Sequence, residues 1–233
     1  MNKIKVATAF SGIGAIEHAL KRLNVDHEIE FACDIDKYCK QTYFANYKIT
    51  EDKWYSDVKA VDGNKYKNNI DLFVGGSPCQ SFSMIGKRKG LEDPRGNLFF
   101  EFARLVDEIR PKVFIFENVK GLVSHNNGET WKIMENKLQE LGYTYYKQVL
   151  NAKNYGIPQS RDRLFVVGFL EKQDFKFPEP IPLTTTMQDF LIDNPDAKYF
   201  LPEKGIAFVQ DEKNLNKKYT QIDGKIALIY YKE

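Results

Sequence analysis

The sequence predicts an α/β fold built on a mostly parallel sheet. Short β-branched or aromatic runs alternate with helical patterns over the first two-thirds of the 233 residues. The apolar runs end in polar or glycine-rich loops, as the strands of a parallel sheet do when helices connect them. With 42% hydrophobic and 14% aromatic residues, the chain has enough apolar material for one well-filled core, which excludes a disordered or fibrous protein.

The expected elements follow one another along the chain. Strands are expected at residues 6–10, 29–32, 72–74 and 113–116. Helices are expected at 37–46, 98–109 and 131–141, and a first helix presents an apolar face of Ile16, Ala19, Leu20 and Leu23. After Gly142, a typical C-cap residue, strands at 145–151 and 164–170 are joined by a turn at 156–158. Two consecutive strands joined in this way indicate an antiparallel pair at one edge of the sheet.

A change of composition divides the chain near residue 178. Pro178, Pro180 and Pro182 break both helix and sheet. We therefore expect a large domain over 1–177, followed by a linker and a smaller region over 178–233. One helix is expected around 187–192, and the last stretch is lysine-rich. The second part is short for a domain that folds independently.

Charge and cysteine usage restrict the functional classes. The 34 basic and 32 acidic side chains give a net charge of +2, so any contact with DNA or RNA must come from local basic patches. Three cysteines without paired spacing favour a reducing cytoplasm over a disulfide framework. The three histidines lie far from each other and from any Cys-x-x-Cys, so no metal site is expected. No apolar run approaches the ~18 residues of a membrane span, and the charged start does not fit a signal peptide. We expect a cytoplasmic protein.

The first strand ends in Phe10-Ser11-Gly12-Ile13-Gly14, where two glycines allow a tight turn beside a ligand. A nucleotide-type site and a turn that carries glycine for packing are both compatible with this segment alone. The second strand ends in Asp34-Ile35-Asp36, and an acid at a strand end can accept both hydroxyls of a ribose. Together they favour an adenosine-containing ligand. Glu17 stands where the dinucleotide fingerprint needs a third glycine, which favours S-adenosylmethionine over NAD.

Cys79 lies in Gly75-Gly76-Ser77-Pro78-Cys79-Gln80-Ser81-Phe82-Ser83, directly after an expected strand. A cysteine on a loop at the carboxyl edge of a sheet is placed to react. The alternative is a small buried hydrophobe, but a buried cysteine does not need such polar and glycine-rich flanks. We interpret Cys79 as a nucleophile, whereas Cys33 and Cys39 fit the buried alternative.

Two further segments supply polar groups at the same sheet edge. Glu117 follows the strand at 113–116, and a carboxylate against apolar strand ends can have its pKa raised and so donate a proton. A solvated loop glutamate is the alternative. Arg161 and Arg163 lie on one face at a spacing of two. Their guanidinium groups suit a phosphate or a carbonyl oxygen, and an ion pair with Asp162 is the alternative.

These segments, in this order, resemble the motifs of the DNA cytosine-5 methyltransferase family over about residues 4–170. The matching residues are Phe10-Ser11-Gly12-Ile13-Gly14, Asp34, Asp57, Pro78-Cys79-Gln80, Asn97-Leu98-Phe99, Glu117-Asn118-Val119 and Gln159-x-Arg161-x-Arg163. The resemblance implies the Rossmann-like fold of S-adenosylmethionine-dependent methyltransferases, with helices on both faces of the sheet. It implies that S-adenosylmethionine is bound by Phe10, Gly12, Gly14, Asp34, Ile35, Asp57, Val58, Pro78 and Leu98. In particular, Asp34 would hold the ribose hydroxyls and Asp57 the adenine amino group, while Phe10 and Ile35 would flank the adenine.

The resemblance also implies a mechanism on a cytosine flipped out of double-stranded DNA. Cys79 would add to carbon 6, so that carbon 5 becomes nucleophilic enough to take the methyl group. Glu117 would hydrogen-bond N3 and the exocyclic amine of the base. Arg163 would hold O2, and Arg161 a phosphate or the nucleophile loop. The stretch 81–95, with the basic triplet 87–89, resembles a loop that closes on the base and meets phosphates.

The resemblance is incomplete at three places. Thr8 stands where the family often has an acid, and Ala15 replaces a common glycine. The segments 184–201 and 204–229 resemble the approach to a target recognition region and its first strands, and the later motifs of the family do not follow. We therefore expect the catalytic portion of a restriction-modification type enzyme, truncated or split, that works poorly without a complementing C-terminal polypeptide.

Three alternatives remain open. A transfer RNA cytosine-5 methyltransferase shares the chemistry of the same family. A non-catalytic fragment would bind the cofactor without transferring a methyl group. A nicotinamide oxidoreductase is disfavoured by Glu17, which breaks the dinucleotide fingerprint.

Overall fold

The computed structural model describes residues 3–78, 98–193, 196–211, 219–222 and 225–228. The chain forms two compact units, Met1–Thr185 and Thr186–Glu233. The division falls shortly after the three prolines at 178–182. In these described ranges, no helix is long and apolar enough to span a membrane.

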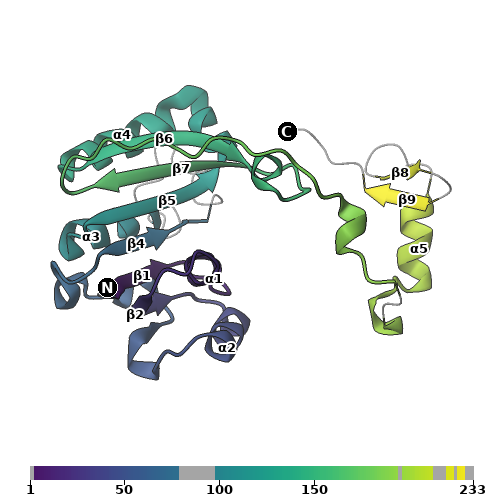
Figure 1. Cartoon of the computed structure of the whole chain (residues 1–233), viewed down its shortest axis with the longest axis horizontal. Helices are drawn as coiled ribbons and strands as arrows, with labels where there is room; N and C mark the ends of the chain where they lie inside the picture. The colour runs from purple at the N-terminus through teal and green to yellow at the C-terminus, as the bar shows by residue number, and fades with distance from the viewer. Residues whose placement is uncertain (1–2, 79–97, 194–195, 212–218, 223–224, 229–233) are drawn as a thin grey trace. The chain divides into compact units, whose positions relative to one another are not determined.

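The first unit is built on a seven-stranded sheet in the order β3-β2-β1-β4-β5-β7-β6 (Figure 1). Strands β1 to β5 are parallel, and β7 runs antiparallel to both β5 and β6. This confirms the predicted mostly parallel sheet with an antiparallel edge pair. The strands are β1 Ile4–Ala9, β2 His27–Cys33, β3 Trp54–Tyr55, β4 Leu72–Gly75, β5 Val113–Val119, β6 Thr144–Asn151 and β7 Asp162–Phe169.

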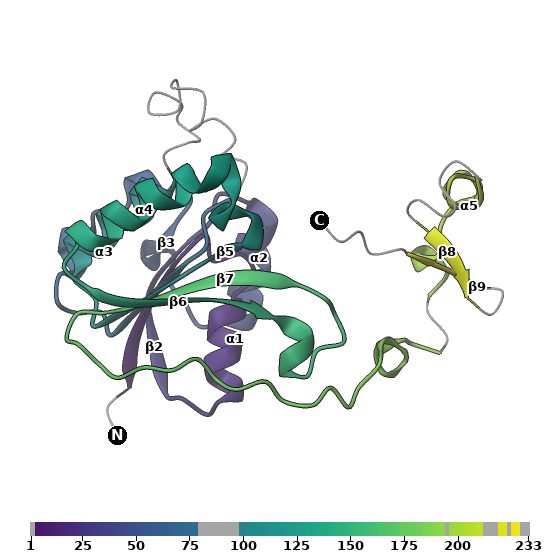
Figure 2. The ribbon, with the colours of Figure 1, turned by 90° about the horizontal axis from the view of Figure 1, so that it is seen from above.

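Helices cover both faces of this sheet. Helices α3 (Leu98–Ile109) and α4 (Glu129–Glu140) lie on one side, and α1 (Ala15–Arg22) lies on the other (Figure 2). Helix α2 (Lys37–Asn46) joins the side of α1, because its Tyr43 hydroxyl donates to the Glu17 carboxylate on α1. The side chains of β1 alternate accordingly: Ala7 and Ala9 enter the large core with α3 and α4, whereas Thr8 reaches Glu17.

Short 3₁₀ helices connect many of these elements. In the first unit they span Glu51–Lys53, Val58–Ala60, Gly63–Tyr66, Lys120–Val123, His125–Gly128 and Ala152–Tyr155. The segment from Val58 to Tyr66 lies against α3, and it follows the short strand β3. This segment therefore connects β3, at the edge of the parallel sheet, to the helix layer that contains α3.

The first helix differs from its expected burial. Ala19 is exposed and Leu23 is 70% exposed, whereas Glu17 is 1% exposed. The reason is that Glu17 has hydrogen-bond partners in the interior, which its charge requires. Of the predicted apolar face, Leu20 is buried and Ile16 is half-buried, so the pattern identified only part of the buried face of this helix.

The second unit differs from the expectation that 204–229 holds strands alone. It contains helix α5 (Glu203–Gln210), and only then the antiparallel strands β8 (Tyr219–Ile222) and β9 (Lys225–Leu228). Pro202 directly before the helix and Glu203 in its first turn are ordinary helix-start signals. The helix expected around 187–192 is a 3₁₀ helix, Met187–Phe190, closed by a capping box between Thr186 and Asp189. A further 3₁₀ helix spans Ala197–Tyr199.

Gly168 on β7 makes the antiparallel pair sensitive to a single methyl group. It lies opposite Phe114 of β5, and a Cβ at Gly168 would stand 2.1 Å from Cε1 of that buried ring. We expect Gly168→Ala to lower the free energy of unfolding by about 1–3 kcal/mol, since overpacking a core typically costs about that much. Gly121→Ala is the control, because its Cβ would meet no atom within 4 Å. Equal denaturation midpoints for the two variants would contradict this packing.

Candidate active site

The carboxyl ends of the central strands meet at one edge of the sheet. Ala9 of β1 pairs with Cys33 of β2 and with Gly75 of β4, and Gly75 pairs with Phe116 of β5. The residues that follow these positions therefore share one edge, where open α/β sheets bind ligands. The structure brings together here the predicted glycine loop, Asp34, the segment up to Pro78, and Glu117.

The glycine loop turns from β1 into α1 with left-handed backbone at three positions. The φ angles are 57° at Phe10, 55° at Gly12 and 88° at Gly14. A side chain at Gly14 is excluded twice, by this φ and by the ring of Tyr47, which would lie 2.1 Å from a Cβ. The Tyr47 hydroxyl also donates to the Gly14 carbonyl at 2.7 Å. A Cβ at Gly12 would meet no atom within 4 Å, so a ligand can approach the backbone at this point.

Asp34 is held against this loop. Its Oδ2 accepts from the Gly12 backbone N–H at 2.8 Å, and its Oδ1 accepts from the Asp36 backbone N–H at 2.9 Å. Ile35, between the two acids, is 86% exposed. Asp36 instead caps α2, where it accepts from the backbone N–H groups of Tyr38 and Cys39. The two carboxylates therefore differ in role: Asp34 faces the loop, and Asp36 begins a helix.

A buried polar network supports the loop from behind, and the sequence pattern did not reveal it. Glu17 Oε1 accepts from the Tyr43 hydroxyl at 2.6 Å and from Thr8 Oγ1 at 3.1 Å. Thr8 Oγ1 lies 2.8 Å from Ser11 Oγ, which accepts from the Cys33 backbone N–H. The network thus joins two helices to the start of the glycine loop. The only sequence signal was an acid on an otherwise apolar helix face.

The remaining predicted cofactor residues come from three segments of the chain. Asp57 is exposed and Val58 is buried, directly after β3. Leu98 is the first residue of α3 and packs against the large core. Pro78 is exposed and is the last residue described before Cys79. Cys79 and the basic triplet 87–89 lie outside the described residues.

Glu117 belongs to strand β5 rather than to a loop after it. The strand continues to Val119 because its last residues still pair with β7. Glu117 Oε1 lies 2.9 Å from Nε of Arg163. Burial raises the pKa of the Glu117 carboxyl, although Arg163 and Arg161 oppose that shift. The carboxyl therefore keeps its proton to a higher pH than a solvated glutamate does.

The backbone before Cys79 passes directly by Glu117. A Cβ at Gly76 would stand 2.8 Å from Glu117 Oε2 and 3.2 Å from the Glu117 carbonyl oxygen, so a larger residue would displace the Glu117 carboxylate from its present position. Asn118, which is buried, donates from Nδ2 to the Ser77 carbonyl at 2.9 Å. Asn118 was part of a predicted motif without a role of its own. Its role here is to hold the segment that leads to Cys79.

The two predicted arginines are not equivalent. Arg163 pairs with Glu117 and donates from Nη1 to the Asp162 carbonyl. Arg161 lies just before β7 with an exposed side chain, and its backbone N–H donates to Asn151. The Asp162 carboxylate binds Lys120 and Asn151. Arg163 therefore forms its ion pair with Glu117, and not with the Asp162 carboxylate as the alternative interpretation held.

The two described cysteines are poor nucleophiles. Burial, together with Asp34 and Asp57, raises the pKa of the Cys33 thiol to about 12. Desolvation, Asp34 and Asp36 also raise the pKa of Cys39. Because the thiolate is the reactive form, neither is activated at neutral pH. Within the described ranges, no three His, Cys, Asp or Glu side chains gather as metal ligands.

Comparisons with known proteins show which family this chain resembles. A family model described as C-5 cytosine-specific DNA methylase matches residues 4–230. The orphan methyltransferase M.SPRI of Bacillus phage SPR is 44% identical over 171 residues, which cover 73% of this chain and 39% of that protein. The type II methyltransferase M.HhaI of Haemophilus parahaemolyticus is 37% identical over 198 residues, covering 84% of this chain and 59% of that protein.

Solved structures show the same fold. The Dnmt2 methyltransferase of S. pombe matches with a TM-score of 0.71 at 22% identity, over 88% of this chain and 66% of that one. The Entamoeba histolytica methyltransferase EhMeth matches with a TM-score of 0.68 at 22% identity, over 87% and 64%. The chain spans only part of its curated relatives: 34% of the length of M.Rho11sI of Bacillus phage rho11s, and 63% of the length of M.NlaX of Neisseria lactamica.

Proposed function

The chain belongs to the C-5 cytosine-specific DNA methylase family, and we propose that it transfers a methyl group from S-adenosylmethionine to carbon 5 of cytosine in double-stranded DNA. The observation that carries the proposal is the meeting of Glu117 with the backbone that leads to Cys79, at the sheet edge that also bears the glycine loop and Asp34. Relatives named type II methyltransferases support a role in restriction-modification. The free thiols Cys33 and Cys39 fit a reducing compartment, and we place the reaction in the cytoplasm.

The residues at this edge fit S-adenosylmethionine. Open space at Gly12 leaves the backbone accessible, and the neighbouring Asp34 carboxylate can accept from ribose hydroxyls. Exposed Ile35 offers an apolar surface to the adenine, and Phe10 is proposed to contact the adenine from the other side. Gly14, Asp57, Val58, Pro78 and Leu98 complete the proposed cofactor set. When bound, the cofactor supplies a methyl group on a positively charged sulfur.

The protein residues prepare cytosine to accept that methyl group. The Cys79 thiolate forms a bond to carbon 6, the pair of the C5–C6 double bond forms a double bond between carbons 4 and 5, and the C4–N3 pair moves onto N3. Glu117, whose pKa is raised by burial, gives its proton to N3 and so neutralises the charge that would develop there. Arg163, which pairs with Glu117, would hold O2, and Arg161 would hold a phosphate or the nucleophile loop. After methylation a base removes the carbon 5 proton, the returning electron pair expels the thiolate, and N3 gives its proton back to Glu117.

Methyl incorporation tests this function. The chain is incubated with labelled S-adenosylmethionine and either mixed-sequence duplex DNA or transfer RNA, with and without a polypeptide that matches the C-terminal part of a relative. We propose that polypeptide as a complementing partner. Label in DNA alone supports the proposal. Label in transfer RNA alone selects the RNA methyltransferase, and cofactor binding without transfer in every arm selects a non-catalytic protein.

Replacing Asp34 separates cofactor binding from folding. We expect Asp34→Ala to weaken binding of S-adenosylhomocysteine at least about tenfold, because two hydroxyl hydrogen bonds to a charged group are lost. Asp36→Ala is the matched control: it removes a helix cap, worth about 1 kcal/mol of stability, and leaves the Asp34 contact to Gly12 in place. Calorimetry measures both. If both variants weaken ligand binding equally, Asp34 does not bind the ribose hydroxyls.

A further inference from the structure

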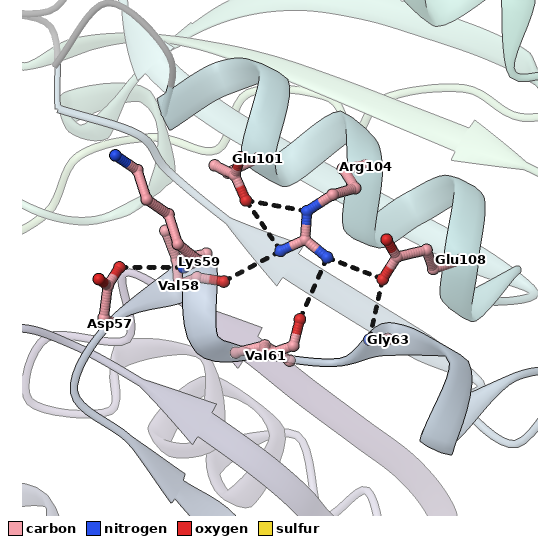
Figure 3. Close-up of polar contacts among 8 residues, drawn as sticks. All are labelled: Asp57, Val58, Lys59, Val61, Gly63, Glu101, Arg104 and Glu108. Carbon is pink, nitrogen blue, oxygen red and sulfur yellow. Dashed lines mark hydrogen bonds and ion pairs between the residues drawn. The ribbon is translucent and has the colours of Figure 1, made fainter. Parts of the chain in front are cut away.

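We propose that Arg104 of α3 is a positioning residue that sets selectivity for the adenine of the cofactor, because it fixes the segment that carries Asp57. The inference rests on the proposed function, since it concerns the same cofactor site. Arg104 was not among the residues that the sequence indicated. Figure 3 shows its guanidinium between α3 and the backbone of residues 58–63.

The segment after β3 is a tight turn whose first residue is Asp57. Asp57 Oδ1 accepts from the Lys59 backbone N–H at 2.9 Å and so caps the 3₁₀ helix Val58–Ala60. Figure 3 shows the other carboxylate oxygen turned away from the turn. Asp57 is exposed, whereas Val58 and Val61 are 4% and 1% exposed. Packing of the two valines in the core fixes the depth of the segment in the molecule. The hydrogen bonds of its backbone fix its orientation relative to α3.

Arg104 makes those polar contacts. Its Nη2 donates to the Val58 carbonyl at 3.2 Å, and its Nη1 donates to the Val61 carbonyl at 3.1 Å. The two carbonyls lie on either side of one turn of 3₁₀ helix, so the planar guanidinium fixes the direction of that turn. Because Asp57 caps the same turn, the direction of its carboxylate follows from the position of Arg104.

Two carboxylates on α3 hold the guanidinium in place. Glu101 lies 2.9 Å from Nε and 2.8 Å from Nη2, and Glu108 lies 2.8 Å from Nη1. Glu108 also accepts from the Gly63 backbone N–H at 2.9 Å. A Cβ at Gly63 would stand 2.8 Å from Glu108, so glycine is needed for this approach. The segment is therefore anchored to α3 at three backbone positions, 58, 61 and 63.

Only arginine can make this set of contacts. Its fork offers five N–H donors in a fixed plane, whereas lysine is a compact point charge. A lysine can stay near Glu101 and Glu108, but it cannot also reach both carbonyls with the same geometry. Arg104→Lys thus keeps the charge and removes the clamp on the turn.

The chemistry of the adenine amino group makes the consequence measurable. A carboxylate accepts a hydrogen bond from that group, whereas the carbonyl oxygen of hypoxanthine, placed at the same point, repels a carboxylate. A correctly directed Asp57 therefore prefers S-adenosylhomocysteine to S-inosylhomocysteine. A clamp that only stabilised the fold would leave this preference unchanged.

Calorimetry with these two ligands tests the inference on the full chain. We expect the native protein to prefer the adenosine ligand at least about tenfold. Arg104→Lys and Arg104→Met should reduce the preference to within about threefold, mainly by weakening the adenosine ligand. In an Asp57→Ala background, a second change at Arg104 should leave the preference unaltered, because both residues act through one contact.

Arg110→Met is the matched control. Arg110 follows the other end of α3, donates from Nη1 to the Leu141 carbonyl at 2.7 Å, and stacks on Tyr143. It stabilises the fold without touching the segment of Asp57, so its replacement should keep the native preference. A native preference retained by Arg104→Lys would overturn the inference. Failure of the native protein to bind either ligand would instead count against the proposed function.

Discussion

Cys79→Ser should abolish methyl transfer and the covalent adduct with DNA that carries 5-fluorocytosine. A serine hydroxyl stays protonated at neutral pH, so it cannot add to carbon 6 of the base. Fluorine at carbon 5 prevents the final loss of a proton and therefore traps a normal adduct. The measurement is a band of protein bound to DNA that survives denaturation, with the protein tested alone and together with the proposed complementing polypeptide.

The other two cysteines provide the controls. Cys39→Ser and Cys33→Ala should still form the adduct, because the pKa of each thiol is raised and neither supplies a thiolate. Cys39 is the better match in chemistry, since it is only partly buried. If the adduct persists in Cys79→Ser and disappears in Cys39→Ser, the nucleophile is Cys39, in the first turn of α2, and not Cys79.

Glu117→Gln should slow methyl transfer by about 10²- to 10⁴-fold, the usual contribution of a positioned acid. The amide retains the shape of the side chain and cannot give a proton to N3. Cofactor affinity should stay native, because Glu117 lies on β5 and its partner is Arg163. Single-turnover rates with saturating cofactor measure the effect. A rate within about threefold of native would remove Glu117 from the chemistry.

The same variant should not lose stability at pH 8. Burial raises the pKa of Glu117 in the folded protein, so the folded state disfavours the ionised carboxylate relative to the unfolded state. Above the folded pKa this difference weakens the fold, and a neutral glutamine removes it. The Tm of Glu117→Gln should therefore equal or exceed the native Tm at pH 8. The difference should shrink as the pH falls through the folded pKa, where the native carboxyl takes up its proton.

Where local signals were strong, the sequence predicted the elements well. Helix α2 begins after Asp36, whose side chain caps it, and α3 ends before Pro111. Their bounds agree with the predicted ranges 37–46 and 98–109. The order of strands also made it possible to place Asp34 and Glu117 at one edge, because parallel strands bring their carboxyl ends together.

Residues whose roles depend on distant partners could not be predicted in this way. Glu17 is recognisable as an interior carboxylate only when Tyr43 and Thr8 are beside it. Arg104 resembles an ordinary helix-surface residue until the carbonyls of 58 and 61 are placed against it. Glu117 was expected in a loop because the pairing that extends β5 comes from β7, much later in the chain.

The order of the strands also governs when the parts of the site form as the ribosome delivers the chain. Strand β1 emerges first and lies between β2 and β4, so the parallel sheet grows outward from its middle. Strand β6 emerges before β7, yet β7 is the one that pairs with β5. We expect β6 and β7 to pair locally and then to dock together. Arg163 arrives with them, so we expect a nascent polypeptide to complete the proposed cofactor site before the proposed site for the base.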